Sequence, residues 1–175
     1  LEFRPEGIYC SQGDFYIDPW RPVDKALITH GHADHARFGS KKYLCTDIAA
    51  PVIRHRLGNV AIETIPYEKE LSLNGVNVSF YPAGHVPGSA QILIEIKGER
   101  WVVSGDYKVG DDGLSTPFKP IKCHSFISEC TFGLPAFNWL PQEQVFKEIN
   151  SFLPSQFFDQ TLKTGAVGAF SKIGC

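Results

Sequence analysis

Three histidines and an aspartate stand close together in the segment 29–36, which reads Thr-His-Gly-His-Ala-Asp-His-Ala. They form the pattern H-x-H-x-D-H, with His30, His32, Asp34 and His35 at its fixed positions. Neutral imidazole is a good ligand for a borderline cation such as zinc, and a carboxylate adds a hard oxygen ligand. The spacing therefore predicts a metal site.

Two further ligand candidates stand later in the chain. A motif this short does not complete a metal site, so other ligands are expected in the loops that follow other strands. His85 lies in Ala-Gly-His-Val and Asp106 lies in Ser-Gly-Asp-Tyr, and each follows a glycine, which allows a close backbone approach. Taken alone, His85 would be a surface or packing residue and Asp106 a turn former. Together with the motif, we interpret both as ligands.

Short strands are expected to position these residues. The apolar runs 7–10 and 15–17 flank Ser11-Gln12-Gly13 and predict a hairpin. The runs 71–73 and 76–80 flank Asn74-Gly75, a strong hairpin signal, and apolar residues alternate with polar ones along 76–80, which predicts one buried face. Further strands are expected at 26–28, 91–96, 101–103 and 125–128.

Helices are fewer than strands. Residues 50–57 suit a helix, with Pro51 in its first turn and Gly58 just past its end. An apolar stripe at helical spacing predicts a second helix at 141–153. The tail 154–175 shows no sustained period and is expected to be a loosely structured end. Many strands with few helices predict an α+β fold in layers.

Composition excludes several classes of protein. The chain has 175 residues, of which 43% are hydrophobic, and 17 basic residues face 19 acidic ones, so it is neither a disordered tail nor a uniformly basic wrapper of nucleic acid. It has no apolar run long enough for a membrane span and no signal peptide. Its five widely spaced cysteines, without a C-x-x-C, favour free thiols in a reducing cytoplasm. The absence of Met indicates a processed or trimmed start.

Positive charge gathers directly after the metal motif. In the segment 37–56 five basic residues face one acid, Asp47. Such a cluster is a solvated face in many proteins, but beside a hydrolytic metal site we interpret it as a track for phosphates. Its members are Arg37, Lys41, Lys42, Arg54 and Arg56, and Lys108 is a further candidate. Tyr107, Phe132 and Phe137 could stack on bases or belong to a core.

The order of these motifs resembles a known superfamily. Asp18, the H-x-H-x-D-H motif, His85 and Asp106 resemble the first four motifs of the metallo-β-lactamase superfamily. The segments 83–90 and 104–107 are similar to those of its β-CASP nucleic-acid hydrolases, and 128–133 resembles that group's first additional motif, with Glu129 as its acid. The segments 7–10, 13–20 and 23–24 resemble bacterial ligase-associated DNA exonucleases. The resemblance covers residues 2–153.

The resemblance implies a dinuclear zinc site in an αββα sandwich. One zinc ion would be held by His30, His32 and His85 and the second by Asp34 and His35, with Asp106 bridging them. Asp34 and Asp106 are the expected catalytic residues. Asp18 would orient ligands, and Glu129 would accept a hydrogen bond from a histidine and so fix its tautomer.

The resemblance also implies a domain plan and a function. Residues 1–127 would form the N-terminal half of the metallo-β-lactamase domain, 128–153 the start of the β-CASP insertion, and 154–175 a tail that does not match. No histidine follows His124, whereas the family has two later His motifs, so we expect an N-terminal portion with an incomplete second zinc site. The expected function is exonucleolytic hydrolysis of DNA, at ends or single strands, in repair beside an ATP-dependent DNA ligase and a helicase. The alternatives are an RNA-processing β-CASP nuclease, a small-molecule hydrolase of the superfamily, and a non-catalytic zinc- or nucleic-acid-binding fragment.

Overall fold

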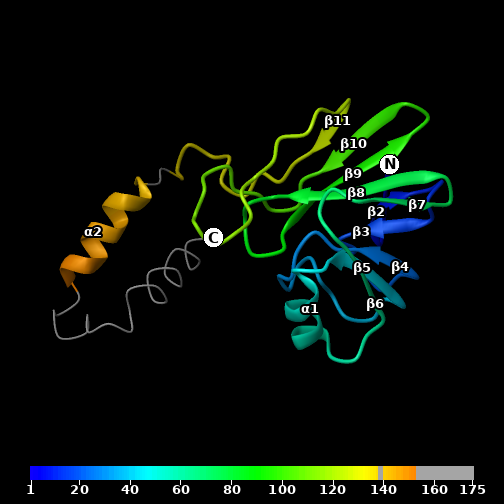
Figure 1. Ribbon diagram of the computed structural model, residues 1–175, viewed down its shortest axis with the longest axis horizontal. Helices are drawn as coiled ribbons and strands as arrows, with labels where there is room; N and C mark the ends of the chain where they lie inside the picture. The colour runs from blue at the N-terminus through cyan, green and yellow to red at the C-terminus, as the bar shows by residue number, and fades with distance from the viewer. Residues whose placement is uncertain (138–139, 153–175) are drawn as a thin grey trace. The chain divides into compact units, whose positions relative to one another are not determined.

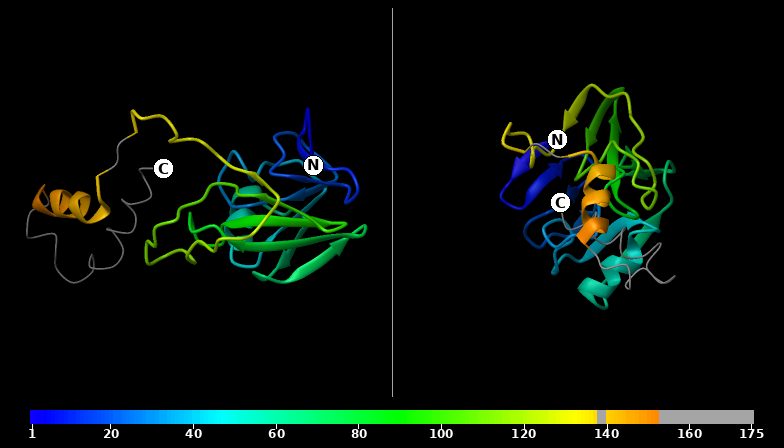
Figure 2. Two further views of the ribbon diagram at one scale, coloured as in Figure 1. Left: turned by 90° about the horizontal axis from the view of Figure 1, so that it is seen from above. Right: turned by 90° about the vertical axis from the view of Figure 1, so that its left-hand side faces the viewer.

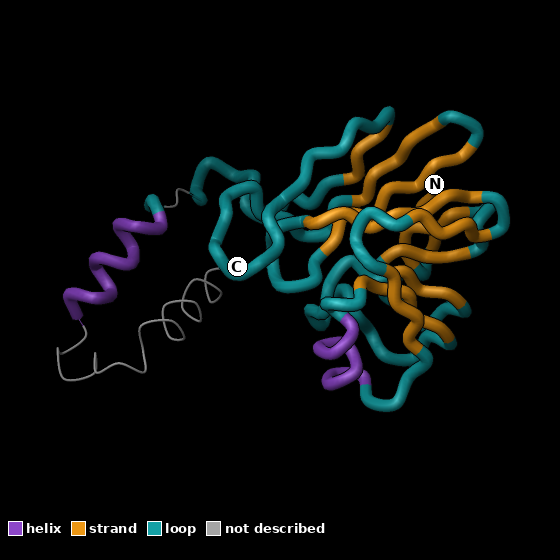
Figure 3. The backbone as a smooth tube through the Cα atoms, in the orientation of Figure 1, coloured by secondary structure: helices purple, strands orange, loops and turns teal. Residues whose placement is uncertain are grey.

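Two sheets form the framework of the fold in the computed structural model, which describes residues 1–137 and 140–152. The six-stranded sheet has the order β1-β2-β3-β4-β5-β6, and the five-stranded sheet has the order β11-β10-β9-β8-β7 (Figure 1). Figure 3 shows that strands, rather than helices, are the main regular elements of this part of the molecule. The predicted α+β class is confirmed.

The six-stranded sheet begins with antiparallel pairs and ends with parallel ones. β1 to β3 pair antiparallel, and β3 to β6 pair parallel. Its strands are β1 (Glu2–Arg4), β2 (Gly7–Cys10), β3 (Phe15–Ile17), β4 (Lys25–Leu27), β5 (Lys42–Thr46) and β6 (Ile62–Ile65). The hairpin predicted around residues 11–13 joins β2 to β3.

The five-stranded sheet is a meander with one parallel addition. β7 to β10 pair antiparallel in sequence order, and β11 pairs parallel with β10. Its strands are β7 (Glu70–Leu73), β8 (Val76–Pro82), β9 (Ala90–Ile96), β10 (Glu99–Val103) and β11 (Ser125–Ile127). The hairpin predicted at Asn74-Gly75 joins β7 to β8, and Val76, Val78 and Phe80 are fully buried, as their alternation predicts.

The main hydrophobic core lies between the two sheets. Phe15, Ile17 and Leu27 of the first sheet pack in one cluster with Phe80 and Ile92 of the second, and all five side chains are fully buried. The two views of Figure 2 show the two groups of strands, blue to cyan and green to yellow, facing each other. The sheets are therefore fixed against each other by apolar burial, the largest favourable term in folding.

A helix covers the outer side of the first sheet. Helix α1 (Ala50–Leu57) lies beside β5 and β6 (Figure 1), and its Ala50, Ile53 and Leu57 pack with Ala26 and Tyr43 in a second core cluster. The helix has the bounds that the sequence predicts, with proline in its first turn and Gly58 just past its end. Within Leu1–Glu129 α1 is the one α-helix, so these residues form three layers of the predicted sandwich.

Three strands were not predicted from the sequence, namely β1, β5 and β6. β5 begins with Lys42 and is otherwise buried, while β6 carries exposed Glu63 and Thr64 next to buried Ile65. Neither strand shows the alternation of a half-buried strand. β5 is held by parallel partners on both sides, which are distant in sequence, so no local hairpin signal marks it.

The chain divides into two compact units, Leu1–Glu129 and Cys130–Cys175. The second unit contains helix α2 (Gln142–Phe152), which matches most of the helix predicted at 141–153. The expected tail 154–175 lies outside the described residues, and the predicted domain boundaries at 127 and 153 stay predictions. Among the residues that the structure describes, neither helix is long and apolar enough to cross a membrane.

Candidate metal centre

The predicted ligands all follow the carboxyl ends of strands. The H-x-H-x-D-H loop follows β4, His85 follows β8, and Asp106 follows β10. Asp18 follows β3 and Glu129 follows β11 in the same way. β3 and β4 are parallel neighbours, and β8 and β10 are both antiparallel to β9. The strand ends that carry the ligands in each sheet therefore point the same way, and the loops meet at one edge.

Four of the predicted ligands form one cluster. Ligand atoms of His30, His32, His85 and Asp106 all lie within 4.8 Å of one another. Nε2 of His85 lies 3.3 Å from Nδ1 of His32. One carboxylate oxygen of Asp106, Oδ2, lies 3.7 Å from Nε2 of His85 and 3.8 Å from Nε2 of His30. This donor set of three imidazoles and one carboxylate suits zinc.

His30 supplies the test of whether a cation fits this cluster. Its side chain is fully buried, and its Nε2 atom has no hydrogen-bond partner. Such an orphaned polar atom in a protein interior is unfavourable and calls for an explanation. A metal ion would accept its lone pair. The 3.3 Å between the ring nitrogens of His32 and His85 also matches the separation of about 3.3 Å between ligand atoms around a tetrahedral zinc.

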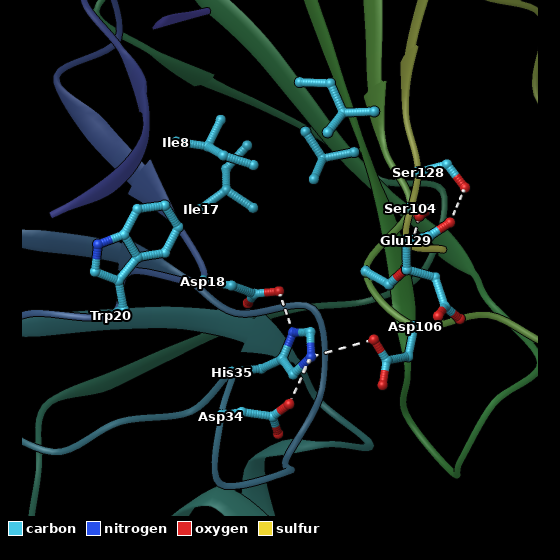
Figure 4. Close-up of a pocket in the computed structure, with 13 residues that line it drawn as sticks. Ile8, Ile17, Asp18, Trp20, Asp34, His35, Ser104, Asp106, Ser128 and Glu129 are labelled. Carbon is cyan, nitrogen blue, oxygen red and sulfur yellow. Dashed lines mark hydrogen bonds and ion pairs between the residues drawn. The ribbon is translucent and has the colours of Figure 1, made fainter. Parts of the chain in front are cut away.

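A second group of predicted ligands adjoins the first. Nε2 of His35 lies 3.2 Å from Oδ1 of Asp106 and 3.6 Å from Oδ2 of Asp34 (Figure 4). The two oxygens of Asp106 thus face different groups, Oδ2 toward His30 and His85 and Oδ1 toward His35. This arrangement fits a carboxylate that bridges two ions, as the resemblance implies for Asp106.

Asp18 and Thr29 connect the two groups from behind. Nδ1 of His35 donates to Oδ2 of Asp18 at 2.7 Å, while the Thr29 backbone N–H and hydroxyl donate to the same carboxylate at 2.8 Å and 2.5 Å. The Thr29 hydroxyl also lies 3.2 Å from Nδ1 of His30. Sequence reasoning missed Thr29. The available signal was a hydroxyl residue directly before the first histidine of the motif.

The surroundings of His30 and His35 hold the two imidazole rings in different protonation states. Burial lowers the pKa of His30, and the positive charge of His35 lowers it further, so His30 is neutral and its Nε2 lone pair is available. Burial also acts to lower the pKa of His35, but hydrogen bonds to Asp106 and Asp18 outweigh it and raise that pKa to about 10. The hydrogen bond from His35 holds the pKa of Asp106 well below its usual range. A cation bound at His35 would replace its proton.

The glycines before His85 and Asp106 serve close backbone approaches, as the sequence predicts. Gly84 and Gly105 have φ values of 74° and 55°. A Cβ at Gly105 would lie 2.6 Å from Cβ of Thr29, and one at Gly84 would lie 2.2 Å from the carbonyl oxygen of Lys108. Both separations are too short for real side chains, so glycine is needed for the ligand loops to touch.

Glu129 and the aromatic candidates each make contacts of their own. Oε1 of Glu129 accepts a hydrogen bond of 3.3 Å from the backbone N–H of Tyr107. The Tyr107 ring packs with Phe118, with ring centroids 5.5 Å apart. Phe132 and Phe137 pack edge to face with each other in the second unit. Stacking of bases on these rings, and the bond from a histidine to Glu129, stay predictions.

The basic residues after the motif make several different contacts. Nε of Arg37 donates to the carbonyl oxygen of Asp34 at 3.1 Å, and Nζ of Lys41 forms an ion pair of 2.7 Å with Asp24. Lys42 is exposed at the start of β5, and Lys108 follows Asp106 on the same loop. Their roles as phosphate ligands stay predictions.

A pocket opens beside the second group of ligands (Figure 4). Its volume is about 250 Å³. Apolar side chains form one part of its wall and the acidic groups form another. The apolar residues are Ile8, Ile17, Trp20, Val103 and Ile127, and the acidic ones are Asp18, Asp34, Asp106 and Glu129. The proposed second ion would therefore border a space next to the apolar wall.

Comparison with curated proteins finds nucleic-acid enzymes. A probable DNA ligase of Opitutus terrae is 31% identical over 150 residues, which are 83% of this chain and 15% of that protein. The endoribonuclease YSH1 of Mycosarcoma maydis is 28% identical over 76% of this chain and 21% of that protein. An RNase J-like protein of Methanocaldococcus jannaschii is 26% identical over 66% of this chain and 33% of that protein. The chain thus spans a third or less of the length of these relatives.

Two further comparisons complete these findings. No protein-family model matches the chain. A solved metallo-β-lactamase of Cronobacter sakazakii, a mutant in the HARLDQ motif, superposes with a TM-score of 0.40 over 46% of this chain and 40% of that chain, at 14% identity.

Proposed function

This chain belongs to the β-CASP group of the metallo-β-lactamase superfamily, and from this membership we propose that it carries metal-binding residues of a nuclease that hydrolyses phosphodiester bonds. The observation that carries the proposal is the cluster of His30, His32, His85 and Asp106 within 4.8 Å, with a buried ring nitrogen that lacks a partner.

The proposed roles of the residues follow their positions. His30, His32 and His85 would hold one zinc ion, Asp34 and His35 would hold the second, and Asp106 would bridge the two. When bound, two such ions would lower the pKa of a bridging water and neutralise the charge of a scissile phosphate.

Other side chains support this site. The Asp34 side chain is 70% exposed, so it can reach a water at the mouth of the site and accept its proton. Asp18 fixes the tautomer of His35 through the 2.7 Å bond to Nδ1, which keeps Nε2 directed toward Asp34 and Asp106.

For the substrate, we propose DNA, with single strands or free ends as the target. The probable DNA ligase of Opitutus terrae supports this choice because its match covers 83% of this chain. Backbone phosphates would contact Arg37, Lys41, Lys42 and Lys108. The exonuclease would act in repair with an ATP-dependent DNA ligase and a helicase as partners. A cytoplasmic setting is supported by the cysteines of the described residues, all of them free thiols.

RNA is the second candidate substrate. Two of the relatives are named as an endoribonuclease and an RNase J-like protein. The proposed metal site would act on the phosphodiester group, which DNA and RNA share, so the choice between the two substrates depends on groups that contact the sugar. The 2′-hydroxyl is the feature that separates the two substrates at such a site.

One experiment tests the metal, the activity and the substrate together. End-labelled single-stranded DNA and RNA are incubated with the zinc-loaded chain, and bound zinc is counted by elemental analysis. Cleavage of DNA that is lost in Asp34→Ala and Asp106→Ala supports the proposal. Cleavage of RNA alone supports the second candidate. Failure of both substrates with one ion or none bound would leave a metal- or nucleic-acid-binding role without catalysis.

A further inference from the structure

The loop that carries four of the proposed ligands, 30–36, has no helix or strand of its own. His32 accepts backbone bonds from His35 and Ala36 at 3.3 Å and 2.8 Å. The carbonyl groups of Gly31 and Ala36 instead accept from a side chain outside the loop. Nη1 of Arg56 donates to them at 2.6 Å and 3.4 Å. Gly31 stands between two ligand histidines and Ala36 follows the last one, so one guanidinium nitrogen joins both ends of the ligand loop.

Arg56 stands on a helix that is packed against the first sheet. It stands in the last turn of α1, and the neighbouring Ile53 and Leu57 are buried in the core cluster between the helix and the first sheet. The backbone of Arg56 is therefore held by the packing of α1 against the first sheet, in a cluster that also includes Ala36 at the end of the ligand loop. Its planar guanidinium has several donors at fixed angles, which suits the capture of more than one carbonyl.

Gly31 gives a second, independent sign that the loop docks on α1. A Cβ at this position would lie 2.9 Å from Cγ1 of Val52, on the same helix. That atom is a methyl group of the half-exposed Val52 side chain, so a side chain at position 31 would have to displace it where the loop meets the helix. Contact and hydrogen bonds thus join the loop and α1 at the same residue.

We infer that Arg56 is a positioning residue for the metal centre, which holds the H-x-H-x-D-H loop against α1 and so preorganises its ligands. The inference rests on the proposed function, because it takes the loop to bind metal, but the hydrogen bonds of Arg56 to the loop do not depend on that function. Ordering a loop costs conformational entropy, and a loop that is ordered before the ion arrives binds it more tightly. Arg56 acts through the carbonyl groups of the loop.

Arg54 provides a matched control. It stands two residues earlier on the same helix, carries the same charge and is also exposed. Its Nη2 donates to the carbonyl oxygen of Ile62, at 3.5 Å, which lies outside the ligand loop. Both substitutions remove one positive charge from the same helix, whereas the hydrogen bonds to the ligand loop are lost with Arg56 alone.

The experiment compares Arg56→Gln, Arg56→Lys and Arg54→Gln with the unaltered chain. Cobalt affinity is measured by titration of its visible absorption, and amide hydrogen exchange of residues 29–37 is measured without metal. Arg56→Gln should weaken cobalt binding about tenfold, as loss of outer partners of a metal site does, and should speed exchange in the loop. Arg56→Lys should restore part of both, because its ammonium can donate to the Gly31 carbonyl. Arg54→Gln should change neither.

The outcomes separate this inference from the proposed function. Equal effects of Arg56→Gln and Arg54→Gln, or no effect of either on exchange, would overturn the positioning role. If Arg56→Gln fails to fold by circular dichroism, Gly31→Ala tests the same docking with the charge intact, and unchanged loop exchange in that variant overturns it. A chain that binds cobalt but cleaves no nucleic acid defeats the proposed function alone. If no cobalt binds, the exchange comparison decides by itself.

Discussion

Asp18 is connected by hydrogen bonds to a histidine in each of the two groups of proposed ligands, on the side of the rings away from the proposed ions. Its carboxylate accepts directly from Nδ1 of His35, and it accepts the hydroxyl of Thr29, which in turn lies 3.2 Å from Nδ1 of His30. One side chain thus orients a ligand of each proposed zinc ion. Such outer partners fix the tautomer of a histidine and raise its strength as a ligand.

Replacing Asp18 by asparagine should therefore weaken metal binding without unfolding the chain. The asparagine side chain keeps the shape and tolerates the φ of 41°, but its amide lacks the charge that holds His35. We expect metal affinity, measured by competition with a chelator, to fall roughly 10- to 100-fold. Asp14→Asn is the control, because Asp14 also has a positive φ, 53°, and bonds to Tyr9 away from the metal centre. Equal losses in both variants would contradict the role of Asp18.

Cys45 gives a prediction at the same scale that is independent of the metal. It is fully buried in β5, and burial raises the pKa of its thiol from 9.0 to about 12. Iodoacetamide at pH 8 should therefore leave Cys45 unmodified in the folded chain, since the thiolate is the reactive form. Exposed Cys130 should react, as peptide mass spectrometry can show for each site. Rapid modification of Cys45 without denaturant would contradict its placement.

The same shift has a consequence for stability at high pH. The unfolded chain releases the Cys45 proton near its ordinary pKa, whereas the folded chain holds it until a higher pH. Above pH 9 the unfolded state therefore gains a thiolate that the folded state disfavours, and the contribution of this group to stability is lost between pH 9 and about 12. Below pH 9 that contribution is complete.

At the scale of elements, the sequence predicts best where the signal is local. Both hairpins, helix 50–57 and the strand ends before His30, His85 and Asp106 are marked by turn residues or by short apolar runs next to them. β5 and β6 could not be predicted in this way, because their hydrogen-bond partners are parallel strands that are not joined to them by a short turn. The same holds for the residues of the candidate site. The spacing of the motif predicts the ligands, whereas the supporting contacts of Thr29 and Arg56 are seen only in the folded structure.

Helix α1 should be a large contributor to the stability of the first unit. Ile53 is fully buried between α1 and the first sheet, among Ala26, Tyr43 and Leu57. Truncation to alanine leaves a cavity, so Ile53→Ala should lower the free energy of unfolding by about 2–5 kcal/mol in urea titrations. Val52→Ala on the same helix is the control, since Val52 is 50% exposed and its loss should be much smaller. Similar losses in both would show that α1 does not pack as described.

At the scale of the whole molecule, the site is assembled from residues that are far apart in the chain but confined to one unit. The backbone N–H of Ala90 donates to the carbonyl of Thr29, and the hydroxyl of Thr46 donates to that of Gly88, so the ligand loops of the two sheets are joined directly. Every proposed ligand, together with Asp18 and Glu129, lies within Leu1–Glu129. The second unit contributes none of them.

Residues 1–129 alone should therefore fold and bind metal as the full chain does. Both core clusters belong to this segment, so removal of 130–175 breaks neither of them. We expect the shortened chain to keep the far-ultraviolet dichroism of a β-rich protein, and its cobalt stoichiometry and affinity should equal those of the full chain within the error of a titration. A change of tenfold or more in affinity would mean that the second unit supplies or orders part of the centre, and the metal site would then have to be assigned to the two units together.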